Sequence, residues 1–103
     1  MIKVMSLLKR KDGMPLAEFR TWATQEHPKL GMQLQGIRAY RMNVVRDDTP
    51  DMPFDAVSEY WFDSKEALDA AFGSDFGQSV AADAIAHCAN RVRLLTEETI
   101  LIP

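Results

Sequence analysis

Residues 14–28, MPLAEFRTWATQEHP, predict an amphipathic helix from which the rest of the fold can be worked out. Pro15 suits the first helical position because its missing N–H needs no partner there, and Glu18 lies in the first turn, where the helix dipole favours an acid. Pro28 is expected to end the helix. The residues of the inward face follow at spacings of three, four and four, with Trp22 beside them: Leu16, Phe19, Ala23 and His27.

The flanking segments predict four strands and a second helix in two pieces. Strands are expected at residues 2–9, 37–46, 56–62 and 91–102, where β-forming residues gather. The stretch 47–55 holds four acids and two prolines and is expected to be a loop.

The second helix is expected to open at Asp63, with Glu66 completing a capping box. Ser74 caps its second piece, which is expected to end near Asn90 in a left-handed turn. The resulting βαββαβ order predicts an α+β, ferredoxin-like fold, with a four-stranded antiparallel sheet and both helices on one face.

The second face of this sheet needs a cover. It carries Met, Val, Trp and Tyr side chains alternating with polar ones, and an exposed apolar patch of that size is uncommon on a monomer. Association of two copies, sheet to sheet, would bury the patch. A monomer with a cupped ligand groove explains the same residues less well.

The overall composition is that of an ordinary globular protein. With 103 residues, the chain 1–103 is expected to form a single domain. The net charge of −3, without a Lys/Arg cluster interleaved with aromatics, argues against a nucleic-acid partner. One cysteine, Cys88, excludes an internal disulfide, and no stretch is apolar enough for a membrane span or a secretion signal, so a cytoplasmic location is expected.

The sequence resembles the EthD family, a branch of the dimeric α/β-barrel superfamily. The resemblance is carried by residues 7–11, 15–19, 26–27, 36–40 and 58–64. It implies a homodimer with an eight-stranded barrel core, and in each subunit a pocket between sheet and helices. Members of the family include small cofactor-independent enzymes, such as lactone isomerases of aromatic catabolism, and cyclase-like proteins of polyketide pathways, while many have no established activity.

The resemblance also implies that His27 and Tyr40 line the pocket as catalytic residues. An imidazole exchanges a proton near neutral pH, and a phenol donates a hydrogen bond to a carbonyl or a developing oxyanion. Placed at the C-terminal end of a helix, His27 would be held near the point of protonation. The alternative is structural: His27 as a core histidine bonded to a backbone carbonyl, and Tyr40 as an aromatic that fills the barrel.

Four further residues are expected to contact the substrate: Trp22, Arg41, Glu59 and Trp61. Glu59 lies on a strand and is expected to pair with Arg38 or Arg41, because a buried carboxylate is costly alone. A proton-carrying role with a raised pKa is its second interpretation. Arg41 would hold a substrate carboxylate through its guanidinium, or remain exposed or interfacial.

The remaining polar groups suggest no cofactor. Asp83 and His87 stand four residues apart on the last helix and are expected to touch, as surface pairs do. Cys88 is interpreted as a packing residue, since no neighbour obviously lowers its pKa. Gly73 and Gly77 are too isolated to cradle a phosphate, and two distant histidines without a third ligand predict no metal site.

The sequence therefore predicts a homodimeric pocket protein that binds a small, partly apolar organic metabolite and needs no cofactor. If it is an enzyme, proton transfer by His27 and Tyr40 would serve isomerisation, cyclisation or lactone rearrangement. Two alternatives remain open: a cofactor-free oxygenase, and a non-catalytic accessory or carrier protein of a degradation pathway.

Overall fold

A computed structural model describes residues 1–49 and 51–103. Nine elements follow one another in these residues: β1 (Ile2–Arg10), α1 (Leu16–Thr21), a π-helical turn η1 (Trp22–Glu26), α2 (His27–Gly31), β2 (Ala39–Val44), β3 (Ala56–Phe62), α3 (Lys65–Gly73), α4 (Asp75–His87) and β4 (Cys88–Thr96). The predicted βαββαβ order is present, with each helix divided into segments.

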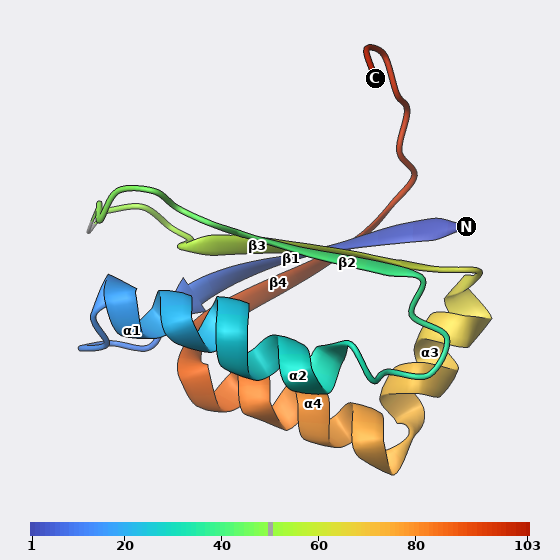
Figure 1. The fold of residues 1–103 in the computed structure, drawn as a ribbon, viewed down its shortest axis with the longest axis horizontal. Helices are drawn as coiled ribbons and strands as arrows, with labels where there is room; N and C mark the ends of the chain where they lie inside the picture. The colour runs from blue at the N-terminus through green and yellow to red at the C-terminus, as the bar shows by residue number, and fades with distance from the viewer. Residues whose placement is uncertain (50) are drawn as a thin grey trace.

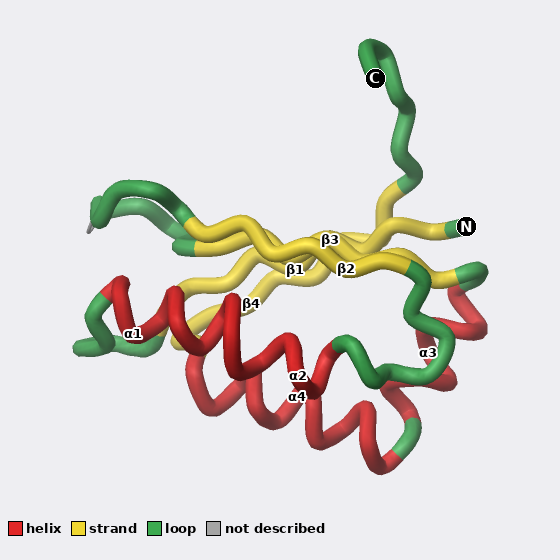
Figure 2. Tube along the Cα trace, viewed as in Figure 1, coloured by secondary structure: helices red, strands yellow, loops and turns green. Residues whose placement is uncertain are grey.

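The strands form one antiparallel sheet in the order β2-β3-β1-β4, and all helices lie on one of its faces (Figure 1). The tube in Figure 2 shows the same two layers, with no helix above the sheet. The predicted α+β, ferredoxin-like fold class is confirmed. The central strand β3 alternates strictly between buried and less buried residues, as a sheet with one covered face requires, and β1 buries Val4 and Leu8 on the same face.

The core between the layers consists of two clusters of buried residues. One gathers under β3 and α3 and includes Val4, Leu34, Tyr60, Phe62, Leu68, Ala71 and Val80. The other lies against α1 and includes Leu8, Phe19, Trp22, Ala23, Ala56 and Ala84. The predicted inward face of the first helix is confirmed, because Leu16, Phe19, Ala23 and His27 are all buried.

The prediction that Pro28 ends the first helix is wrong. Helical backbone runs through α1, η1 and α2 to Gly31, and Pro28 lies in the first turn of α2. Proline normally interrupts a helix because it lacks an N–H. Here the wider π turn precedes it, with the N–H of His27 bonded to the carbonyl of Trp22 five residues back, so the regular pattern is already broken where the proline enters. His27 therefore lies within a helix and not at its C-terminal end.

Other boundaries also differ from the predictions. β2 spans Ala39–Val44 rather than 37–46, and β4 begins at Cys88 rather than at 91. Ser64, not Asp63, caps α3, because its hydroxyl accepts the N–H of Ala67 at 3.1 Å. The last helix ends at His87 without a left-handed residue, since Cys88 is already extended and begins β4. β4 ends at Thr96 rather than 102, because pairing with β1 stops at Lys3. Ser74 caps α4 as predicted, accepting the N–H of Gly77 at 3.0 Å.

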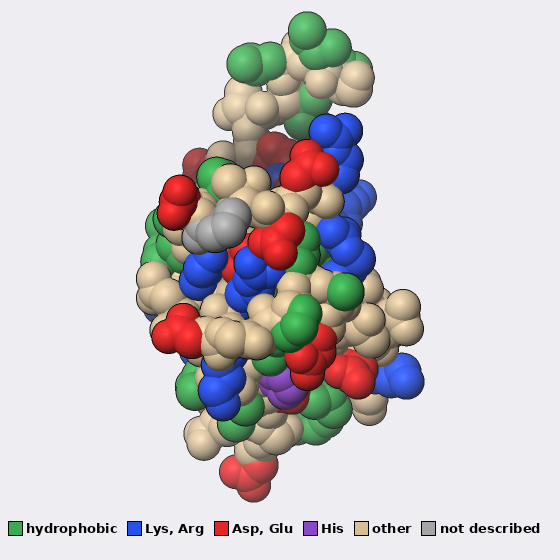
Figure 3. Space-filling view, turned by 90° about the vertical axis from the view of Figure 1, so that its left-hand side faces the viewer, with side chains coloured by type: hydrophobic (Ala, Val, Ile, Leu, Met, Phe, Trp, Pro, Cys, Tyr) green, Lys and Arg blue, Asp and Glu red, His purple; other side chains and the backbone are tan. Residues whose placement is uncertain are grey.

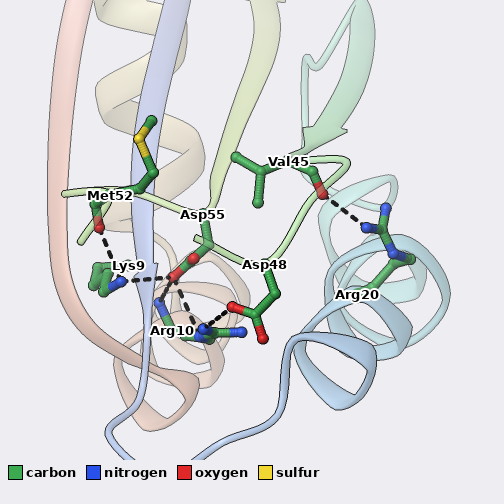
Figure 4. Close-up of polar contacts among 7 residues, drawn as sticks. All are labelled: Lys9, Arg10, Arg20, Val45, Asp48, Met52 and Asp55. Atoms are coloured by element: carbon green, nitrogen blue, oxygen red, sulfur yellow. Dashed lines mark hydrogen bonds and ion pairs between the residues drawn. The ribbon is translucent and has the colours of Figure 1, made fainter. Parts of the chain in front are cut away.

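A polar cluster joins the β2–β3 connection to the end of β1 (Figure 4). We call Lys9, Arg10, Asp48 and Asp55 the Asp55 cluster. The carboxylate of Asp55 is 2% exposed and accepts the backbone N–H of Arg10 at 2.9 Å, with Lys9 Nζ at 3.5 Å. Its backbone N–H also donates to the carbonyl of Leu8 at 2.8 Å. Acidic and basic side chains are intermingled over this end of the molecule (Figure 3).

After β4 the chain leaves the sheet on the side away from the helices (Figures 1 and 2). The segment carries Ile100, Leu101 and Ile102, which are exposed. Among the described residues, no helix has the length and apolarity needed to cross a membrane.

Candidate functional site

A pocket lies between the sheet and the helices, where the two core clusters meet. We call it the central pocket. Its walls come from all four strands and from α2, α3 and α4, and they include His27, Tyr40, Ser58, Tyr60, Arg91 and Arg93. The space between its walls, including the part open to solvent, is about 480 Å³. About 50 Å³ is wide enough for the centre of a water molecule. The structure thus places the two predicted catalytic residues, His27 and Tyr40, in one pocket.

His27 is held by a carboxylate behind it. Its side chain is 10% exposed, and its Nδ1 lies 2.8 Å from Oδ2 of Asp83 on α4. A carboxylate accepts and does not donate when ionised, so this contact places a proton on Nδ1. A neutral His27 then keeps the lone pair of Nε2 for proton transfer, which is the role of the aspartate in a catalytic Asp–His pair.

Trp22 lies behind His27 rather than in the wall of the central pocket. Its indole N–H donates to the same Oδ2 of Asp83 at 3.0 Å, and its ring centroid lies 4.8 Å from that of His27. Five residues along a regular α-helix point about 140° apart. The π turn aligns Trp22 with His27 instead, so that both reach one carboxylate.

His87 completes this arrangement from the end of α4. Its ring stacks on Trp22 at 4.7 Å, with 16° between the planes, and its Nδ1 lies 2.8 Å from the backbone oxygen of Asp83. The predicted contact with the Asp83 carboxylate exists at 3.4 Å, but the shorter contact of that carboxylate is with His27. We call Trp22, His27, Asp83 and His87 the Asp83 cluster.

Tyr40 faces the central pocket from β2, the strand at one edge of the sheet. Helix α2 approaches it closely at Gly31, where an added Cβ would lie 2.8 Å from the tyrosine ring, so only glycine fits there without displacing the ring. Burial raises the pKa of the Tyr40 phenol to about 12, helped by the neighbouring Tyr60. The phenol therefore stays neutral and keeps its O–H to donate at physiological pH.

Tyr60 and Ser6 provide a second polar pair in the wall, which the sequence analysis missed. Their hydroxyl oxygens are 3.1 Å apart, and the Tyr60 ring meets Tyr40 edge to face at 6.2 Å. The alternation of β3, with Ser58 and Tyr60 on the helix side, is the signal that would have placed Tyr60 in the pocket.

Arg41, Glu59 and Trp61 lie on the uncovered face of the sheet, away from the central pocket. Arg41 sits over the Trp61 ring at 4.8 Å, and Lys3 sits over it at 4.9 Å. The structure does not bring these three predicted substrate contacts together with His27 and Tyr40.

Glu59 forms an ion pair, but the prediction that its partner is Arg38 or Arg41 is wrong. Glu59 pairs with Lys3 at 2.7 Å and accepts the amide of Asn43 at 2.9 Å. Lys3 of β1 is opposite Trp61 and reaches Glu59 diagonally on the same face, whereas Arg41, which is directly opposite Glu59 on β2, lies over the Trp61 ring instead. The Lys3 hydrogen bond lowers the pKa of Glu59, which excludes the proton carrier with a raised pKa. Arg38 pairs with Asp63 instead.

Cys88 is partly buried where α4 passes into β4. Burial raises the pKa of its thiol to about 11, so the thiolate is scarce at neutral pH and the packing interpretation is supported.

The EthD domain family matches residues 11–89, which is more than half of the chain. The chain belongs to the EthD family. None of the curated proteins matches this sequence.

Solved structures share the fold at low sequence identity. A crystal structure of an ethyl tert-butyl ether d (EthD) family protein from Bacillus halodurans is 20% identical, with a TM-score of 0.80 over 96% of this chain and 99% of the other. A dimeric ferredoxin-like protein of unknown function from Thermobifida fusca is 15% identical, with a TM-score of 0.69 over 92% and 88%. SnoaB from Streptomyces nogalater, a cofactor-independent oxygenase, is 13% identical, with a TM-score of 0.69 over 98% and 97%.

Proposed function

We propose that this EthD family member catalyses cofactor-independent proton transfer on a small, partly apolar organic metabolite bound in the central pocket. His27 is the acid–base group, and Tyr40 is the hydrogen-bond donor. The observation that carries the proposal is the 2.8 Å contact between His27 Nδ1 and Asp83, which leaves Nε2 of a pocket-lining imidazole available.

The chemistry follows from the two side chains. Nε2 of His27 takes a proton from a carbon next to a substrate carbonyl, and the imidazolium formed is stabilised by the carboxylate of Asp83. The Tyr40 hydroxyl donates a hydrogen bond to the oxygen on which negative charge develops. Return of the proton to a different carbon completes an isomerisation, and attack of the carbanion within the same molecule completes a cyclisation.

The size and lining of the central pocket support a small substrate. The space that admits the centre of a water molecule is about 50 Å³, well below the roughly 300–1,000 Å³ of pockets for drug-sized ligands, so only a small molecule fits unless the walls move apart. The inner wall is mostly apolar, with Leu8, Leu34, Ile37, Met42, Val80 and Ala84. A compact ring or short chain with one or two oxygen atoms fits this lining.

Deuterium uptake by a panel of simple carbon acids tests the proposal even while the natural substrate is unidentified. Small lactones and 1,3-diketones are incubated in D₂O with the protein, and exchange of their acidic C–H is followed by proton NMR. We expect the protein to accelerate exchange, His27→Ala to slow it by a factor of about 100 or more, and Asp83→Asn to slow it by about tenfold or more. Deuterium exchange by the His27→Ala protein at the rate of the unaltered protein contradicts the proposal.

Asp69→Asn is the matched control, because it also removes one carboxylate. Asp69 lies on α3, is 61% exposed and pairs with Lys65. Its exchange rate is expected to equal that of the unaltered protein.

The same assay separates the two alternatives. A compound that binds at the pocket residues and is recovered without exchange favours a carrier or accessory protein. Turnover that requires dissolved oxygen favours a cofactor-free oxygenase, the activity of SnoaB, which shares this fold.

We also propose that two copies of the chain associate through the uncovered sheet face. Support comes from Val92 and Leu94, which are 37% and 46% exposed on that face, and from solved relatives described as dimeric. Leu94→Glu is expected to dissociate the dimer in sedimentation experiments. Leu95→Glu is the matched control, since Leu95 is 47% exposed and points to the opposite face. A Leu94→Glu protein that remains dimeric contradicts this interface.

A further inference from the structure

Two arginines of β4 stand at the mouth of the central pocket. Arg91 and Arg93 are two residues apart on one strand, so they share the face that looks toward the helices. They stand opposite Leu8 and Ser6 of β1, which also line the pocket. β4 is an edge strand, and both arginines are exposed. Together with Ser6 they also line a hollow at the sheet edge that continues the pocket outward.

The two guanidinium groups are not neutralised by the protein. Among residues 1–49 and 51–103, no carboxylate lies within 4 Å of either group. Six other cationic side chains of this acidic protein have such a partner: Lys3, Lys9, Arg10, Arg38, Arg46 and Lys65. The part of the pocket wall that the structure describes contains no Asp or Glu side chain. The mouth therefore carries uncompensated positive charge.

Arg93 is also held in place. Its guanidinium lies over the Phe72 ring at 4.4 Å, and Phe72 belongs to the pocket wall. A guanidinium held against an aromatic ring keeps N–H groups at its edge that are free to donate. This contact positions Arg93 beside the opening rather than away from it.

We propose that the substrate of this site is an organic anion whose carboxylate is bound by Arg91 and Arg93 while its apolar part enters the central pocket toward His27. This deepens the proposed function by naming the substrate class, and it rests on that function for the identity of the pocket as the reacting site. A carboxylate accepts two parallel N–H donors from a guanidinium, which orients as well as attracts the ligand. A neutral molecule of the same shape would gain neither the attraction nor the orientation that the guanidinium gives a carboxylate.

Binding of paired acids and amides tests the proposal. Benzoate, phenylacetate and hexanoate, each with its neutral amide, are titrated into isotope-labelled protein, and saturable amide shifts at pocket residues give the affinities. We expect each acid that binds to do so about tenfold tighter than its amide, and added salt to reduce this preference because the arginines are exposed. Arg91→Gln with Arg93→Gln is expected to abolish the preference.

Arg46→Gln is the matched control for the loss of an arginine. Arg46 is 91% exposed, pairs with Asp47 and does not line the central pocket. The acid preference is expected to survive in it. Equal affinity for acids and amides, a preference that persists in the double variant, or the absence of saturable binding by all three acids overturns the proposal.

His27→Ala separates this proposal from the proposed function. If His27 transfers no proton but the arginines bind carboxylates, the acid preference remains in the unaltered protein and in His27→Ala, while deuterium uptake is absent in both. If proton transfer occurs on neutral ketones without any preference for acids, the proposed function stands and the anion site does not.

Discussion

Asp55 and Asp83 each have several polar groups around the carboxylate, but these groups differ in kind. The side chain of Asp55 is 2% exposed and faces the side chains of Lys9 and Arg10 and the backbone N–H of Arg10. Asp83 is 25% exposed and is met by an indole N–H and by two imidazoles, His27 and His87. The first carboxylate faces cationic side chains and backbone, whereas the second faces the nitrogen atoms of aromatic rings.

The difference distinguishes a structural carboxylate from a functional one. Surrounding a buried carboxylate with permanent cations and backbone donors secures the end of β1 to the β2–β3 connection (Figure 4). A carboxylate that contacts the nitrogen atoms of aromatic rings beside a pocket instead orients an imidazole. Burial alone would have ranked Asp55 as the more notable residue, but the chemistry of the partners favours Asp83 as part of the site.

The largest expected effect is on folding stability. Asp55→Ala leaves the buried backbone N–H of Arg10 without its acceptor and removes the carboxylate that faces Lys9 and the Arg10 side chain. It should lower the free energy of unfolding by about 3 kcal/mol. Asp83→Ala removes two hydrogen bonds at a more exposed site and should cost about 1 kcal/mol. Urea unfolding followed by circular dichroism measures both values. Equal losses would remove the distinction between the two clusters.

Asp48→Asn serves as the control within the Asp55 cluster. The side chain of Asp48 is 55% exposed, and within residues 1–49 and 51–103 its one ion-pair partner is Nη2 of Arg10. Its substitution should change the free energy of unfolding by less than about 0.5 kcal/mol.

The next effect concerns how the pocket responds to high pH. Burial raises the pKa of Tyr40 to about 12, whereas an unfolded tyrosine titrates near 10. Between these values the folded chain keeps a proton that the unfolded chain has lost, so raising the pH favours unfolding. From about pH 9 to about pH 11 the unaltered protein should lose about 1 kcal/mol more stability than Tyr40→Phe. Denaturant unfolding of both proteins at both pH values measures the difference. Equal losses of stability in the two proteins would mean that the Tyr40 hydroxyl is exposed to solvent.

The smallest effect uses Cys88 as a reporter of both carboxylates. Asp83 and Asp55 each raise the pKa of its thiol, Asp83 more strongly, while Arg91 lowers it. At about pH 8, Asp83→Asn should therefore speed alkylation by iodoacetamide by about twofold, and Asp55→Asn by less. Arg91→Gln should slow it. A reversed order of the two aspartates would mean that the thiol lies nearer the Asp55 cluster.

The order of the elements along the chain and the layered fold could be predicted because they depend on short-range patterns. The alternation of residues 56–62 and the spacing of Leu16, Phe19 and Ala23 are properties of regular strands and helices, and the structure keeps them. Boundaries were missed for two reasons: strand pairing decides where β4 ends, and two adjacent residues, Asp63 and Ser64, could both cap α3. β4 ends where pairing with Lys3 ends, and Ser64 rather than Asp63 meets the helix N–H groups.

The candidate site could be predicted only in part, for a physical reason. His27 and Tyr40 came from the family resemblance, but the link from His27 to Asp83 joins residues 56 positions apart and depends on a π turn. A regular periodicity of about 3.6 residues places Trp22 and His27 on different sides of the helix. The sequence pattern therefore gives no sign that both side chains contact Asp83. Arg91 and Arg93 were missed because the mouth of the pocket exists only once β4 pairs with β1.

The π turn of Trp22–Glu26 contains one more residue than a regular α-helical turn, as if one residue had been inserted into the helix. Deletion of Thr24, which is exposed, would leave Trp22 and His27 four positions apart on a regular α-helix, and four positions again align two side chains. Relatives with an unbroken helix should therefore carry the tryptophan–histidine pair at a spacing of four. An alignment that keeps the spacing constant would pair His27 with the wrong residue, and a one-residue gap in this turn restores the correspondence.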